Sequence, residues 1–143
     1  MLISTKGRYA LRVMIDLAEH NNGEYIALKE IAARQGISEK YLESIISVLT
    51  KAEFLIGHRG KGGGYKLTKQ PEQYTVASIL KLTEDSLAPV SCLNQNPVVC
   101  ERVAECRTLP MWKKLDKIID DFFESYTIAD LTQNYNINDN YVI

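Results

Sequence analysis

The fold is decided by residues 28–52, LKEIAARQGISEKYLESIISVLTKA. Two apolar stripes with helical spacing flank the stop at residues 36–38. They consist of Leu28, Ile31 and Ala32 before it and of Leu42, Ile45, Ile46 and Leu49 after it. Gly36 suits a turn because glycine tolerates a positive φ, Ser38 can cap the second helix, and Ile37 can fill the angle between them. The stretch predicts helices over about 28–35 and 38–52, joined as a helix-turn-helix.

A further amphipathic helix is expected upstream of this pair. Ser4 or Thr5 can cap its start, and Asn21, Asn22 and Gly23 end it. Its apolar face holds Ala10, Val13, Met14, Leu17 and Ala18, and its polar positions are Arg8, Arg12, Asp16 and Glu19. This spacing predicts a helix that packs on the helix-turn-helix through one face only.

Downstream, the apolar pattern changes from helix-like to strand-like. Leu55-Ile56 and Tyr65-Lys66-Leu67 enclose a glycine-rich tip, HRGKGGG at residues 58–64, which predicts a β-hairpin. A helix-turn-helix followed directly by a hairpin is a winged helix. The expected fold class is therefore mainly α with a small β-hairpin wing.

The second half of the chain predicts a short helix, a loop and a long helix. Thr75 can cap the short helix, residues 84–109 form an irregular loop, and Pro110 suits the first turn of the last helix. A wide apolar stripe marks that last helix, with Trp112, Leu115, Ile119 and Phe122 at its centre. We interpret the stripe as a homodimer interface, the alternative being packing within one subunit.

The tip of the hairpin does not match the glycine-rich loops of enzymes. No Ser or Thr follows Lys61, as a phosphate-binding loop requires, and Tyr65 stands where a dinucleotide fingerprint needs its third glycine. An arginine on a tip with few side chains suits the narrow minor groove of DNA. We attribute the glycines to this approach to DNA, because an ordinary turn needs only one or two.

The start of the helix after Ser38 is the candidate DNA-recognition surface, because early residues of such a helix reach base edges in the major groove. The expected DNA-binding residues are Ser38, Lys40, Tyr41, Glu43, Ser44, Arg59 and Lys61. Residues 1–70 carry eleven Lys and Arg against seven Asp and Glu (net +4), whereas residues 71–143 carry six against eleven (net −5). Only the first half is therefore suited to approach double-stranded DNA.

Three cysteines, Cys92, Cys100 and Cys106, lie within 15 residues of the predicted loop. An odd number of clustered cysteines makes a poor disulfide framework, and thiolates ligate soft metals and iron–sulfur clusters. From their spacing alone, a set of metal ligands and three unrelated thiols are equally good interpretations. Their confinement to one loop favours ligation.

These features divide the chain into four parts. We expect a winged helix-turn-helix DNA-binding domain over residues 1–70, a linker helix with a cysteine-bearing sensing loop over 71–109, a dimerisation helix with a short turn over 110–133, and a frayed tail over 134–143. No signal peptide or membrane-spanning run is visible, which indicates a cytoplasmic protein without membrane contact. No catalytic constellation is visible, so an enzyme is not expected.

Several motifs together resemble the winged-helix regulators typified by IscR, NsrR and CymR. They are STKGRYAL at residues 4–11, Ile31-Ala32, QGIS at 35–38, YLE at 41–43 and RGKGGGY at 59–65. The resemblance covers about residues 1–132. It implies a homodimer with a long crossed helix, a recognition helix in the major groove and an arginine-bearing wing in the minor groove. The implied base-reading positions are Lys40, Glu43, Ser44 and Arg59.

The resemblance also implies that the three cysteines hold an iron–sulfur cluster, of the 2Fe–2S type, with an unknown fourth ligand. IscR-like proteins place a histidine three residues after the third cysteine, where this chain has Leu109. NsrR-like proteins recruit an acidic residue from the partner's first helix, where this chain has Arg8. Neither fourth ligand carries over to this sequence.

Three hypotheses follow from the sequence. The first is a repressor or other regulator that senses an iron–sulfur cluster and controls iron–sulfur biogenesis or related redox and sulfur genes. The second is a cluster-free regulator that responds to thiol oxidation or to a partner protein of cysteine metabolism. The third is an electron-transfer or metal-handling protein that uses the winged fold for protein contacts.

Overall fold

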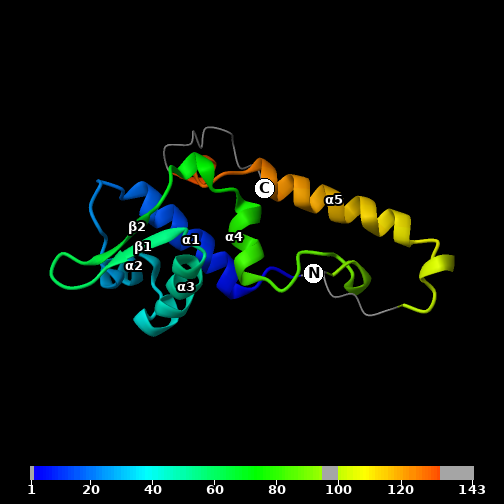
Figure 1. Ribbon diagram of the computed structural model, residues 1–143, viewed down its shortest axis with the longest axis horizontal. Helices are drawn as coiled ribbons and strands as arrows, with labels where there is room; N and C mark the ends of the chain where they lie inside the picture. The colour runs from blue at the N-terminus through cyan, green and yellow to red at the C-terminus, as the bar shows by residue number, and fades with distance from the viewer. Residues whose placement is uncertain (1, 95–99, 133–143) are drawn as a thin grey trace.

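A computed structural model describes residues 2–94 and 100–132 (Figure 1). The helices in these ranges are α1 Thr5–Glu19, α2 Leu28–Gln35, α3 Glu39–Lys51, α4 Val76–Thr83 and α5 Leu109–Ser125. Strands β1 Leu55–His58 and β2 Gly64–Leu67 form an antiparallel hairpin after α3. The predicted fold class, mainly α with a hairpin wing, is confirmed. The predicted tail at 134–143 lies outside the described residues.

Local signals in the sequence fix the helix ends. The side chain of Ser4 accepts a hydrogen bond from the backbone N–H of Gly7, and that of Ser38 accepts one from Tyr41. Gly36 ends α2 with φ +63°, and Ile37 is buried beside it, as predicted. The turn between α2 and α3 therefore has the chemistry that a helix-turn-helix requires.

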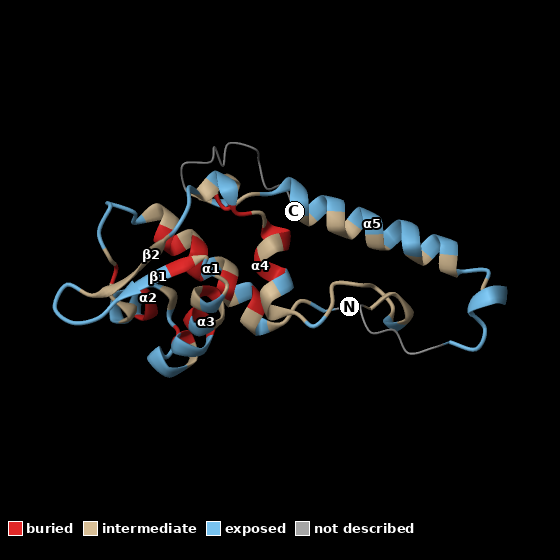
Figure 2. Ribbon diagram, viewed as in Figure 1, coloured by how far each residue is buried: buried red, intermediate tan, exposed pale blue. Residues whose placement is uncertain are grey.

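The core lies where α1, α3 and α4 meet, and Figure 2 shows its buried residues on the helices from α1 to α4. Its largest fully buried side chains include Met14, Leu17, Ile31, Leu42, Ile45, Leu49, Tyr74 and Ile79. Asp16, one of the polar positions of the predicted first helix, is also buried. Arg34 and Gln35 of α2 donate hydrogen bonds to its carboxylate, which the helical pattern alone did not indicate.

The wing contains more than the two predicted strands. β1 and β2 pair from Leu55 with Leu67 to His58 with Gly64. Ile26 pairs with Tyr65 on the free side of β2 through two backbone hydrogen bonds, of 2.9 and 2.8 Å. This bridge ties the segment before α2 to the wing.

The glycines of the tip have reasons inside the protein. Gly60 and Gly62 adopt φ +93° and +74°. A Cβ atom at Gly63 would lie 2.3 Å from the carbonyl oxygen of His58, and one at Gly64 would lie 2.1 Å from that of Ile26. Backbone geometry and close backbone contacts therefore give these four glycines a structural reason beside the approach to DNA to which we attribute them.

Helix α5 extends away from the core as an arm (Figure 1). Its C-terminal end is attached to α4, because the backbone N–H of Val76 donates to the carbonyl of Tyr126 and that of Ile128 donates to Tyr74. Pro110 occupies its first turn, as predicted, although the helix begins one residue earlier. None of the residues of α5 is buried (Figure 2).

Candidate functional site

The start of α3 presents a polar, exposed surface. Ser38 caps the helix, and Lys40, Glu43 and Ser44 are exposed within its first two turns. The buried stripe from Leu42 to Leu49 holds the opposite face against the core. The helix is therefore fixed from behind, and its early polar side chains are free to reach a ligand.

Three of the predicted DNA-binding residues also serve the helix itself. Ser38 Oγ is occupied by the cap, and Ser44 Oγ donates to the carbonyl of Tyr41 at 2.7 Å. Tyr41 is half-buried, and its ring meets that of Tyr9 edge-on with centroids 5.8 Å apart. Among the predicted DNA-binding residues of α3, Lys40 and Glu43 are therefore the two whose side chains have no described contact within the protein.

The wing carries the other two predicted DNA-binding residues. Arg59 and Lys61 are both exposed on the tip, and the tip and α3 lie at the end of the molecule away from the free end of α5 (Figure 1). A cleft of about 460 Å³ separates the tip from the helices; it is lined by Arg59, by Leu28 at the start of α2 and by Thr50 near the end of α3. The cleft thus lies between the wing, the start of α2 and the end of α3, and the exposed start of α3 does not line it.

Sequence reasoning missed the contacts that hold the wing in place. Tyr74, buried in the core, accepts hydrogen bonds from the backbone N–H groups of Thr68 and Lys69 and donates to the carbonyl of Phe54. Tyr25 stacks on His58 at the outer face of the wing. The turn before Tyr25 gave no sign of strand pairing, because the pairing spans nearly 40 residues of sequence.

The three cysteines are free thiols on the segment between α4 and α5. Cys92 lies in the 3₁₀ turn Ser91–Leu93, Cys100 is exposed, and Cys106 ends the 3₁₀ turn Val103–Glu105. Within residues 2–94 and 100–132, no three His, Cys, Asp or Glu side chains form a group that could hold a metal ion. The predicted ligand set is therefore not assembled among these described residues.

Cys106 has the environment of a stabilised thiolate. Its Sγ lies 3.5 Å from Thr108 Oγ1. Hydrogen bonds from that hydroxyl and from the backbone N–H groups of Thr108 and Leu109 hold the pKa of the Cys106 thiol below its ordinary value. Because the thiolate is the form that ligates metals, the donor chemistry suits a soft metal, although the ligand geometry is not formed.

The segment between α4 and α5, residues 84–108, is called the thiol segment below, and it is anchored at its start. Glu84 Oε1 accepts hydrogen bonds from the backbone N–H of Ser4 at 2.9 Å and from its hydroxyl at 2.7 Å. This contact joins the segment to the first residues of α1. Nothing in the sequence pattern pointed to it, since the two residues are 80 positions apart.

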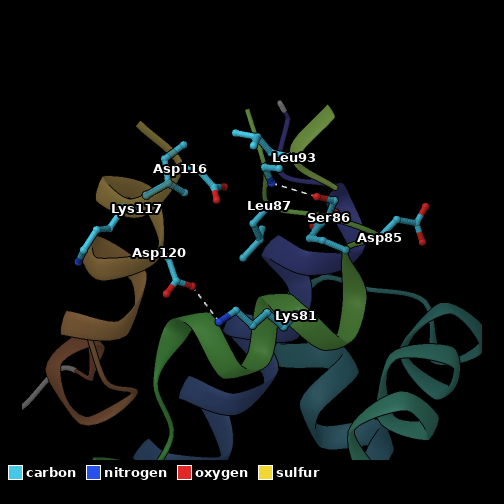
Figure 3. A pocket seen from close by; sticks show the side chains of 11 residues that line it. Lys81, Asp85, Ser86, Leu87, Leu93, Asp116, Lys117 and Asp120 are labelled. Atoms are coloured by element: carbon cyan, nitrogen blue, oxygen red, sulfur yellow. Dashed lines mark hydrogen bonds and ion pairs between the residues drawn. The ribbon is translucent and has the colours of Figure 1, made fainter. Parts of the chain in front are cut away.

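A cleft of about 440 Å³ lies between the start of the thiol segment and α5 (Figure 3). Leu87 and Leu93 line it from the segment, and Ile119 lines it from α5. Lys81 of α4 reaches across to Asp120 of α5 at 2.8 Å, and this hydrogen bond raises the pKa of Lys81. The thiol segment therefore borders the arm directly.

The apolar stripe on α5 lacks a cover among the described residues. Its exposed members are Met111, Leu115, Ile118 and Phe122 on the helix and Tyr126, which directly follows it. Two of the predicted interface residues, Leu115 and Phe122, belong to this stripe. The other two, Trp112 and Ile119, are half-buried on an adjoining face of the helix, and Ile119 faces the cleft.

A helix-turn-helix core with an exposed recognition helix and a basic wing tip defines a winged-helix DNA-binding protein. In the described ranges, no helix has the length and apolar character to cross a membrane. The chain belongs to the Rrf2 family, described as iron-dependent transcriptional regulators, whose model matches residues 3–134. The protein is accordingly a DNA-binding transcriptional regulator and not an enzyme.

Named relatives agree with this assignment. The chain is 37% identical to Protein rrf2 of Nitratidesulfovibrio vulgaris over 134 residues, which cover 94% of this chain and 89% of the relative. It is 36% identical to the HTH-type transcriptional regulator IscR of Sodalis glossinidius over 139 residues, covering 97% and 83%.

Solved structures show the same fold. CymR, the global cysteine regulator of B. subtilis, superposes with a TM-score of 0.78 at 32% identity, covering 94% of this chain and 98% of that one. IscR of T. potens superposes with a TM-score of 0.73 at 34% identity, covering 98% and 92%. The predicted resemblance to IscR-like and CymR-like regulators is confirmed.

Proposed function

We propose that this protein is a homodimer that represses or otherwise regulates transcription by placing α3 in the major groove and the wing tip in the minor groove of an operator. The observation that carries the proposal is the exposed polar start of α3 together with the exposed Arg59 on the wing tip. Lys40 and Ser44 contact phosphates or bases, Glu43 accepts from a cytosine amino group, and Arg59 enters the minor groove with Lys61 on the backbone. Two copies then read two half-sites.

The uncovered stripe of α5 supports the homodimer. A helix with four exposed large apolar side chains on one face, followed directly by the exposed Tyr126, needs a partner surface. A second α5 of identical sequence offers a matching stripe, and a two-fold dimer uses the same patch from both subunits. Such a dimer carries two wings and two copies of α3, one set for each half-site.

The DNA proposal is tested with a duplex that the protein itself selects from a random-sequence pool. Arg59→Ala should weaken binding about tenfold or more, the loss typical of one specific base contact. Lys113→Ala, which removes one exposed positive charge from α5, is the matched control and should stay within about twofold. Equal losses in both variants would contradict an arginine-bearing wing in the groove.

We further propose that Cys92, Cys100 and Cys106 together hold an iron–sulfur cluster that modulates operator binding in the cytoplasm. Support comes from three accessible free thiols on one segment, from the thiolate-favouring surroundings of Cys106 and from the similarity to proteins named IscR. Such a cluster supplies a redox-active centre when bound. The fourth ligand is not assigned, because Leu109 and Arg8 offer no donor of the expected kind.

Anaerobic reconstitution with iron and sulfide tests this part. The wild-type chain should gain visible absorption and bound iron, and a variant with all three cysteines replaced by serine should gain neither. Operator affinity should differ between the loaded and iron-free wild-type protein. A colourless, iron-free protein after reconstitution, with unchanged operator binding, would reject the cluster.

A cluster-free regulator is the second candidate, favoured by the unassembled thiols and by the structural similarity to CymR of B. subtilis. It would respond to thiol oxidation or to a partner protein of cysteine metabolism. If mild peroxide changes operator affinity in the wild-type chain but not in the cysteine-free variant, thiol oxidation is the signal. Unchanged regulation in the cysteine-free variant would exclude thiol oxidation as the signal and leave binding of a protein partner.

A further inference from the structure

The outer face of the wing carries an aromatic contact that the DNA-binding proposal does not use. Ile26 pairs with Tyr65, which continues the sheet beyond β2 and sets Tyr25 opposite Lys66. Side chains alternate across a strand, so Tyr25, Lys66 and His58 share the face that points away from the core. Buried Leu55 lies on the other face.

Tyr25 touches both strands of the wing. Its ring stacks on the imidazole of His58 at the end of β1, with centroids 5.2 Å apart and planes 28° from parallel. The ammonium group of Lys66 on β2 lies 4.6 Å from the centroid of the same ring, within the range of a cation–π contact. A residue from outside the hairpin thus holds both strands.

The position of Arg59 depends on this contact, because Arg59 follows His58 directly and begins a tip rich in glycine. Gly60 and Gly62 have positive φ, and a single backbone hydrogen bond, from Gly63 N–H to the carbonyl of Gly60, is described within the tip. Glycine gives the backbone wide conformational freedom, so such a tip holds its own shape weakly. The direction of the tip therefore depends on His58, the last residue of β1 before it.

We propose that Tyr25 is a positioning residue for DNA binding, which orients the arginine-bearing wing tip through His58 and Lys66 without contacting DNA itself. The proposal rests on the function proposed above, in which Arg59 enters the minor groove. A wing tip that is already ordered before binding raises the affinity for DNA, because it loses less conformational freedom when the complex forms.

A double-mutant cycle with the self-selected duplex tests the proposal. Tyr25→Ala should weaken binding about tenfold, the loss expected from one aromatic pair. Tyr25→Phe, which keeps the ring, should bind within about twofold of wild type. In an Arg59→Ala background, Tyr25→Ala should cost almost nothing further, because the side chain that it positions is gone.

Two variants keep the test independent of any folding defect in Tyr25→Ala. His58→Ala removes the exposed half of the stack and should reproduce the loss of affinity with an unchanged melting temperature. Ile56→Ala, on the same face of the same strand but outside the stack, should bind as wild type does.

The outcomes separate the two proposals. Wild-type affinity in both Tyr25→Ala and His58→Ala, or losses that simply add to that of Arg59→Ala, would overturn the positioning role while DNA binding stands. A wild-type protein that selects no duplex, or an Arg59→Ala variant that binds as wild type does, would instead overturn the groove contact on which the positioning role depends.

Discussion

At the scale of single residues, Asp16 joins α1 to the helix-turn-helix. Its carboxylate is 1% exposed and accepts hydrogen bonds from Arg34 Nε at 3.0 Å, from an Arg34 terminal nitrogen at 2.8 Å and from Gln35 Nε2 at 2.8 Å. The guanidinium is about one-third exposed, which limits its desolvation cost. A bidentate pair of this kind fixes the angle at which α2 meets α1.

Asp16→Ala should lower the free energy of unfolding by about 2 kcal/mol, because three hydrogen bonds to a charged group are lost and Gln35 keeps no acceptor there. Chemical denaturation measures the change. Asp120→Ala is the matched control: it breaks an exposed ion pair with Lys81 and should cost under about 1 kcal/mol. Equal losses in the two variants would contradict a structural role specific to Asp16.

At the scale of elements, the wing is held closed by close backbone contact. Gly64 has φ +152°, and a Cβ there would lie 2.1 Å from the carbonyl oxygen of Ile26. Gly36, at the end of α2, also has a positive φ, but a Cβ there would have no neighbour within 4 Å. A substitution at Gly36 therefore tests backbone strain alone, whereas a substitution at Gly64 adds a direct clash with Ile26.

Gly36→Ala should cost about 1 kcal/mol of stability from the left-handed backbone alone. Gly64→Ala should cost roughly 2 kcal/mol or more, because the bridge between Ile26 and Tyr65 must also open. Thermal unfolding compares the two variants. A Gly64→Ala variant as stable as Gly36→Ala would mean that the segment before α2 does not pack on the wing.

Helix α5 is the element proposed to join two copies. Phe122→Asp places a charge in the exposed stripe and should raise the dimer dissociation constant at least about 30-fold, as expected for a central aromatic side chain. Lys113→Glu, on the opposite face, should leave it unchanged. Sedimentation equilibrium reads out both, and a Phe122→Asp variant that stays dimeric would place the interface elsewhere.

The sequence predicted elements best where the signal is local. The caps at Ser4, Ser38 and Thr75, the turn at Gly36 and the early proline of α5 each act within a few residues, and each helix begins near its predicted start. The pairing of Ile26 with Tyr65 and the contact of Ser4 with Glu84 escaped prediction, because they join positions far apart in the chain. Helical periodicity likewise could not show that a second helix covers Asp16.

At the scale of the whole molecule, the proposed DNA-binding surface and the free end of α5, the proposed dimerisation helix, lie at opposite ends (Figure 1). The exposed start of α3 and the wing tip belong to the half with net charge +4, and α5 belongs to the half with net charge −5. The thiol segment connects them, tied to α1 through Glu84 and bordering α5 across the cleft. The start of that segment is therefore in contact with the cap of α1 and lines a cleft with α5.

The same arrangement sets how salt affects DNA binding. The proposed contacts place several basic side chains on phosphates, so each contact releases counterions from the duplex. The proposed contacts leave α5, which belongs to the acidic half, away from the DNA, so its charges should contribute little repulsion at moderate salt, where charges are screened beyond about 10 Å.

The most direct measurement is an equilibrium titration of the wild-type protein with its self-selected duplex and with a scrambled duplex, over a range of salt concentrations. We expect the selected duplex to bind about 10³-fold or more tightly than the scrambled one, with the logarithm of the affinity falling linearly as the logarithm of the salt concentration rises. Equal affinity for both duplexes, or no binding at low salt, would contradict a regulator that reads DNA through α3 and the wing.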